Sequence, residues 1–180
     1  MASKFDARYL TVLGISVAAL VMSVLSWRNS TRLADDAFTP RLSFTDLQLT
    51  ATYPDDAESE ETLLHYKIQN QGRLPMHNLQ IAEVVTAGNH KNVKQETRQT
   101  AAFEPGGPVD SVTYLTPSVV VPVGFTPDAV ATGKMPFSIQ FETESSTERT
   151  DRYITCENFH FNHYTGKFDR ASTCTPEVFK

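Results

Sequence analysis

Two patterns of hydrophobic positions divide the chain. A run without charged residues extends from Tyr9 to Trp27, and Arg8 and Arg28 flank it. After Arg41, apolar residues recur at every second position instead. The first pattern is typical of a membrane-spanning helix, because about 28 Å of helix matches the hydrocarbon core of a bilayer. The second is typical of β-strands that bury one face.

The ends of the uncharged run predict contacts with the membrane interface. Tyr9 and Trp27 are aromatic residues of the kind enriched at this depth, and Arg8 and Arg28 lie just beyond them. A cleaved signal peptide is an alternative, but Trp27 and Arg28 occupy positions where a signal peptidase needs small residues. A buried soluble helix is the other alternative. We therefore expect an uncleaved anchor that contacts the lipid bilayer.

Small residues recur four positions apart within this run. Gly14 and Ala18 form one such pair, and Ala19 and Ser23 form another. Small residues allow two membrane helices to approach closely. These four positions are the predicted helix-packing residues.

The pattern predicts four segments: an N-terminal tail over 1–8, a transmembrane helix over 9–27, a helical stalk or linker over 28–40, and a β-sandwich domain over 41–180. The last segment has the size of one domain with its own core. Within it, Leu42 and Phe44 are followed by Leu47 and Leu49 on the opposite parity, which predicts a strand with a bulge. Further strands are expected over 64–69, 79–85, 109–115, 118–123, 136–142, 152–156 and 158–168.

Turn-forming residues separate these strands. Gly72 lies in Asn70-Gln71-Gly72, where a positive φ would favour glycine. Gly and Pro also cluster over 105–108, and single prolines interrupt the later strands. Short strands with this punctuation predict an all-β, antiparallel sandwich, preceded by one transmembrane helix.

A resemblance supports this architecture. The hydrophobic helix that runs into Ser26–Ala37, the segment Thr39–Phe44, and Tyr66–Gly72 with Pro75 and Leu79–Ile81 resemble uncharacterised bacterial single-pass membrane proteins. The outer domains of those proteins are similar to immunoglobulin-like, adhesion-related modules. The resemblance covers roughly residues 10 to 86. It implies an immunoglobulin-like β-sandwich and provides no catalytic residues to transfer.

Composition and motifs narrow the function. The net charge is −5, and residues 1–32 carry +3, so the rest of the chain carries −5 − 3 = −8. The domain is therefore acidic and unsuited to nucleic acid. The sequence contains no nucleophile elbow, metalloprotease helix, phosphate loop or dinucleotide fingerprint. We expect a protein without enzymatic activity and without a cofactor, which acts on a protein partner at the membrane.

The cysteines carry the most specific chemical prediction. Cys156 and Cys174 are the two cysteines of the chain, and a disulfide between them is expected if the domain is exported. Such a bridge would contribute about 3 kcal/mol by restricting the unfolded chain. The alternatives are separate thiols, or a zinc site in which His160 and His163 complete a C-x3-H-x2-H-x10-C set. We expect the disulfide and no metal.

These observations predict a non-catalytic binding or assembly module of the cell envelope. It would reside in the plasma (inner) membrane as a single-pass protein, with its N-terminus in the cytoplasm and the C-terminal domain exported. Basic residues are balanced on the two sides of the span, so the orientation depends on the short tail and on the cysteine pair. One alternative is an envelope hydrolase or metal-dependent enzyme with a site near His160 and His163. Another is an accessory subunit of a larger membrane complex.

Overall fold

A computed structural model of the chain describes residues 7–52, 61–97, 102–116, 120–148 and 150–179. Within these ranges, the side chains of residues 7–14, 32–38, 95, 97, 150 and 151 are not described. The chain divides into two compact units, Met1–Thr39 and Pro40–Lys180, and each is considered by itself.

The first unit contains one helix, α1 (Ala7–Phe38). It runs without a break through the predicted span and the predicted stalk. Every side chain described in it, from Ile15 to Thr31, is exposed. Among the described residues, no helix is long and apolar enough to cross a membrane. The span predicted over 9–27 is therefore not supported by the structure, and its first six side chains lie outside the described ones.

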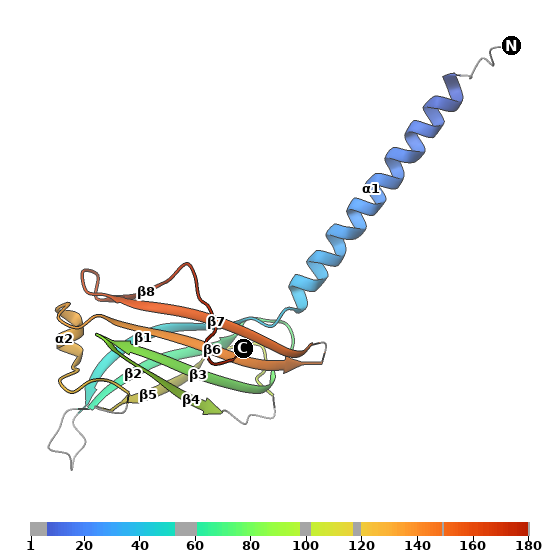
Figure 1. The fold of residues 1–180 in the computed structure, drawn as a ribbon. Helices are drawn as coiled ribbons and strands as arrows, with labels where there is room; N and C mark the ends of the chain where they lie inside the picture. The colour runs from blue at the N-terminus through green and yellow to red at the C-terminus, as the bar shows by residue number, and fades with distance from the viewer. Residues whose placement is uncertain (1–6, 53–60, 98–101, 117–119, 149, 180) are drawn as a thin grey trace. The chain divides into compact units, whose positions relative to one another are not determined.

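The second unit is a β-sandwich of two antiparallel sheets, as predicted (Figure 1). The three-stranded sheet has the order β1-β2-β5. Its strands are β1 (Leu42–Thr52), β2 (Glu61–Asn70) and β5 (Val109–Leu115). The five-stranded sheet has the order β4-β3-β6-β7-β8. Its strands are β3 (His77–Ala87), β4 (His90–Thr97), β6 (Phe137–Thr147), β7 (Thr150–Asn162) and β8 (Lys167–Arg170).

The bulge predicted from the change of parity in β1 is confirmed. The register between β1 and β2 shifts between Thr45 and Gln48, and Asp46 has a φ of 54°. The extra residue lets Leu42 and Phe44 point into the core while Leu47 and Leu49, after the shift, still pack against it.

Several predicted elements differ from the structure. The strands predicted over 152–156 and 158–168 are replaced by the single long strand β7, a turn, and β8. Of the strand predicted over 118–123, the part that is described is a turn with an isolated bridge residue at Val121. Strand β4 was not predicted, because its sequence is polar on both faces. The short helix α2 (Pro127–Ala131) was not predicted either, although Thr126 caps it and Pro127 begins it.

The core lies between the two sheets. Phe44 stacks on Phe141 with ring centroids 4.1 Å apart, and Tyr66 contacts both rings, with its centroid 4.7 Å from Phe141 and 5.9 Å from Phe44. Apolar residues of alternating parity from β2, β3 and β6 surround these rings. Alternation in each strand therefore selects which side chains face the other sheet.

The connection between β2 and β3 passes from one sheet to the other, and Asn70 organises it. The buried Asn70 side chain donates to the carbonyls of Leu74 and Phe103 and accepts from the N–H of Gly72. Gly72 is not among the residues with positive φ, so the predicted reason for glycine there is wrong. The Asn70 side chain makes hydrogen bonds with backbone groups of the turn, so the turn forms without a residue in the left-handed region.

Candidate functional site

The two histidines singled out in the sequence line one cleft of about 430 Å³ beside α2. The Nε2 of His160 lies 4.0 Å from Asp169 Oδ2, which is too long for a hydrogen bond. The His163 ring is tilted against Tyr164, with centroids 3.9 Å apart. Gly133 leaves room for it, because a Cβ there would come within 3.1 Å of the ring. The cleft therefore offers two imidazoles within a largely apolar lining.

The zinc alternative does not agree with this arrangement. Cys156 and Cys174 form the predicted disulfide, with their Cα atoms 5.6 Å apart, so neither is a thiolate that could bind metal. In the described part of the chain, no group of three or more His, Cys, Asp or Glu residues is placed to hold a metal ion. His160 and His163 share a cleft but do not form a ligand set with the cysteines.

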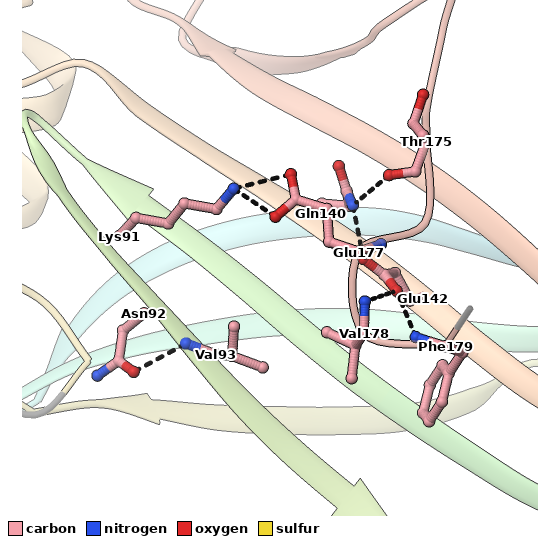
Figure 2. Close-up of polar contacts among 9 residues, drawn as sticks. All are labelled: Lys91, Asn92, Val93, Gln140, Glu142, Thr175, Glu177, Val178 and Phe179. Atoms are coloured by element: carbon pink, nitrogen blue, oxygen red, sulfur yellow. Dashed lines mark hydrogen bonds and ion pairs between the residues drawn. The ribbon is translucent and has the colours of Figure 1, made fainter.

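The disulfide is one attachment of a C-terminal strap, which we define as residues 171–179. The second attachment is Glu142 on β6, whose carboxylate accepts backbone N–H groups of the strap (Figure 2). Oε1 accepts from Glu177 at 2.7 Å, and Oε2 accepts from Val178 at 2.7 Å and Phe179 at 3.1 Å. Gln140 also donates to Oε1 and to the carbonyl of Thr175. Successive N–H groups that converge on one carboxylate form an anion-binding turn.

The strap covers apolar residues on the outer face of the five-stranded sheet. Ala82 and Val84 lie beside Glu142 and Gln140 in the β3–β6 register, on the face opposite to the core. Both are buried, and so is Phe179 at the end of the strap. Lys91 on β4 adds an ion pair with Glu177 at 2.6 Å. The strap thus closes a small apolar layer that is separate from the main core.

Burial and hydrogen bonding act in opposite directions on Glu142. Burial raises the pKa of this carboxyl, but the N–H groups of Glu177, Val178 and Phe179 and the amide of Gln140 outweigh it. The net result is a pKa below the usual value. The strap therefore stabilises the ionised form.

A second buried carboxyl, Glu83, lies inside the sandwich. The hydroxyls of Tyr66 and Thr113 donate to it from the opposite sheet, with Thr113 Oγ1 at 2.7 Å from each carboxylate oxygen. Burial raises the pKa of Glu83 despite these hydroxyls. Burial and the neighbouring Glu83 also raise the pKa of Tyr66. This network joins the two sheets, which suggests a role in their register.

A third carboxyl joins the sheets at the other side of the sandwich. Glu157 on β7 accepts from the backbone N–H of Phe44 at 3.3 Å and from Arg170 at 2.7 Å. Burial raises the pKa of Glu157, while Arg170 and the Phe44 N–H act against this. The contact also occupies a donor on β1, which is an edge strand.

The four edge strands of the sandwich are protected unequally. The bulge and the Glu157 contact alter the edge of β1, β4 carries Lys91 and Lys94, and β8 has only four residues. Strand β5 has seven residues, with Asp110 as its one charge and no proline or bulge. Val109, Val112 and Tyr114 are 44%, 40% and 55% exposed on it. Within the described residues, no strand pairs with its outer edge. Such an edge is suited to pairing with another strand.

The predicted residues of the N-terminal helix are only partly described. Ala18, Ala19, Ser23, Trp27 and Arg28 lie on α1 with exposed side chains. The side chains of three further residues lie outside the described ones: Arg8, Tyr9 and Gly14. Their roles at a membrane interface or in helix packing stay predictions.

The carboxyls that organise the domain were missed from the sequence, although one gave a signal. Glu83 follows Leu79 and Ile81 on the apolar parity of its strand, where a charge is unexpected. Glu142 gave no such signal, because it occupies a polar position of its strand and its backbone partners lie in the distant strap. The open edge of β5 could not be recognised without the strand order.

Comparisons with known proteins show distant structural similarity alone. No protein-family model matches the chain, and no curated protein matches it in sequence. A Bordetella pertussis protein described as ApaA is 13% identical, covers 65% of this chain and 88% of its own, and has a TM-score of 0.44. A protein of Arabidopsis thaliana, solved in solution, is 14% identical over 80% of this chain and 89% of its own, with a TM-score of 0.42. An Archaeoglobus fulgidus protein is 11% identical over 67% of this chain and 98% of its own, with a TM-score of 0.37.

Proposed function

We propose that this chain is a non-catalytic binding or assembly module of the cell envelope, and that β5 is its binding edge. The partner is a protein that contributes an extended segment and adds a strand beside β5. Main-chain hydrogen bonds would provide affinity, and side chains that alternate along the added strand would provide specificity. The observation that carries the proposal is the contrast between β5 and the three protected edges.

The side chains of β5 fit this role. Val112 and Tyr114 project from the outer face of the three-stranded sheet, where an added strand would place its own side chains next to them. Lys67 on β2, which forms an ion pair with Asp46 at 2.8 Å, also lies opposite Asp110 in the register, so the one charge of β5 has a positive charge nearby. An approaching backbone therefore meets an edge with little charge to desolvate.

We propose further that the sandwich is immunoglobulin-like. The sheet orders β1-β2-β5 and β4-β3-β6-β7-β8 agree with an immunoglobulin-like sandwich, because the chain passes between the sheets from β2 to β3, from β4 to β5 and from β5 to β6. Modules of this architecture present edges and loops rather than a deep active site. This agreement supports a binding role.

The binding edge can be tested with matched lysine substitutions. Val112→Lys places a charge on β5, and Val93→Lys places one at a similarly exposed position of the edge strand β4. Full-length protein would be recovered from cells in mild detergent, with thermal unfolding as the check on folding. Val112→Lys should reduce the copurifying partner at least tenfold, and Val93→Lys should leave it unchanged. Equal loss in both variants, or loss in neither, would exclude β5 as the binding edge.

Attachment to the inner membrane rests on the sequence. The run from Tyr9 to Trp27 lacks charge, and the apolar side chains described in α1 lie exposed on all sides of the helix. The disulfide supports an oxidising compartment for the domain. The full chain should resist carbonate extraction and keep its intact mass. A mature N-terminus between Ser23 and Asp36 would identify a cleaved signal peptide instead.

The cleft that contains His160 and His163 is the observation in favour of an envelope enzyme. Imidazoles serve as metal ligands or general bases, but a base needs a partner that orients it. The carboxylate of Asp169 receives its hydrogen bond from Asn162, at 2.8 Å, rather than from His160. Metal analysis of the purified full chain separates the two functions. Stoichiometric metal that is lost in His160→Ala would favour the enzyme.

A further inference from the structure

We propose that the strap is a redox-controlled latch, which the Cys156–Cys174 disulfide and the carboxylate of Glu142 hold against the sheet. The latch holds residues 175–179 over Ala82 and Val84 on the outer face of the five-stranded sheet. Reduction of the bridge would release one of its two attachments, so that the strap leaves that face more often. This is a separate device from the binding edge on β5, which belongs to the other sheet.

The two attachments differ in kind and lie close together on the sheet. Cys156 on β7 is directly opposite Glu142 on β6 in the strand register. The disulfide therefore brings the chain to the sheet at Cys174, and the Glu142 carboxylate holds it again at Glu177 to Phe179. Because the first attachment fixes the strap near the second, it raises the effective concentration of the strap at Glu142.

The hairpin enclosed by the disulfide has its own support. Strands β7 and β8 pair from Phe159 with Arg170 to Asn162 with Lys167, and Ala171 donates to the carbonyl of Asn158. The strap beyond Arg170 belongs to no strand. Loss of the bridge should therefore act on the strap before it acts on the hairpin, since regions without a ladder open at lower free energy.

The redox step uses a small dithiol as the reductant. One thiolate of the dithiol attacks a sulfur of the Cys156–Cys174 bridge and forms a mixed disulfide. The second thiol then displaces it, so the dithiol becomes a cyclic disulfide. Two electrons and two protons pass to the protein, and both cysteines become thiols. The strap is then held by Glu142, the Phe179 side chain and the Lys91–Glu177 ion pair.

Hydrogen exchange on the full chain in mild detergent tests the latch. Mass spectrometry would follow peptides from the strap and from β6, with and without dithiol. Thiol labelling of the denatured protein would confirm the redox state. We expect the strap amides to exchange at least tenfold faster after reduction, while β6 amides stay unchanged. In oxidised Glu142→Gln, the same strap amides should also exchange faster although the bridge is intact.

Each other outcome contradicts the latch. Unchanged strap exchange after complete reduction would show that the disulfide does not control the strap. Faster exchange in both the strap and β6 would show that the bridge supports the whole domain. Cys156→Ser combined with Cys174→Ser should reproduce the reduced pattern without a reductant, which separates loss of the bridge from other effects of the dithiol.

Discussion

Glu83 and Glu142 are two fully buried carboxyls of the domain with opposite electrostatics: Glu83 lies deep between the sheets, and Glu142 lies under the strap at the outer face. Both side chains have no exposed surface. Hydroxyls from the facing sheet contact Glu83, and its pKa is raised; backbone N–H groups of the strap contact Glu142, and its pKa is lowered. Burial alone therefore does not determine the charge of a carboxyl. The depth of burial and the donors that contact the carboxylate decide it together.

The two carboxyls belong to two different layers of the molecule. The inner layer, with Glu83, Tyr66 and Thr113, joins the two sheets by side chains that folding of the sandwich brings together. The outer layer, with Glu142 and the strap, is closed by backbone groups of the last residues in the chain. The outer layer should therefore open independently of the inner one.

The largest expected effect is at Glu142. Glu142→Gln replaces an accepting oxygen by a donating amide, so at least one strap N–H loses its partner. We expect a loss of about 2–3 kcal/mol in the free energy of unfolding, measured by urea titration at pH 7. The control is Glu144→Gln on the same strand and face, where the carboxylate pairs with the exposed Arg152. An equal loss in both variants would remove the special role of the strap.

The inner layer should respond less strongly. Tyr66→Phe removes a hydroxyl that donates to Glu83 and leaves the ring in place, so we expect a loss of about 1–2 kcal/mol. Thermal and urea unfolding would measure it. Tyr114→Phe, on the exposed face of β5, should be nearly neutral. A neutral Tyr66→Phe would indicate that Thr113 alone satisfies Glu83.

The pH dependence should differ in sign between the two carboxyls. Glu142 has a lowered pKa, so its contribution is present above its ordinary value of 4.5 and is lost as pH falls through the folded pKa. Glu83 has a raised pKa, so its contribution is present below 4.5 and is lost as pH rises through the folded pKa.

Urea titrations between pH 3 and about 8 would reveal this contrast. The stability deficit of Glu142→Gln should shrink as the solution becomes acidic. Glu83→Gln should gain stability relative to the natural chain as pH rises above the ordinary value. Parallel pH profiles for the two variants would mean that the two sites are electrostatically alike.

The smallest expected effect is at the rim of the strap. Lys91→Ala removes the ion pair with Glu177, whose side chains are about half exposed. Water and salt screen such a pair, so we expect a change of about 0.5 kcal/mol or less. Urea unfolding at low and high salt would measure it. A loss as large as that of Glu142→Gln would show that the ion pair, rather than the buried carboxylate, holds the strap.

The sequence by itself determined the local features of this protein. Alternation predicted the sandwich and the range of β5, and the change of parity after Phe44 predicted the bulge. The cysteine pair predicted the disulfide. These features depend on neighbouring residues or on one simple pairing, so a linear pattern contains enough information to recognise them.

Only the tertiary structure decided which groups meet across the sheets. Glu142 lies 35 positions from Glu177, and Glu83 lies 30 positions from Thr113, so no local pattern could indicate either contact. The strand order likewise made β5 an edge and β2 a centre, although both alternate in the same way. The burial and the hydrogen-bond partners of a polar residue depend on which distant segments pack against it. That packing is a property of the complete fold.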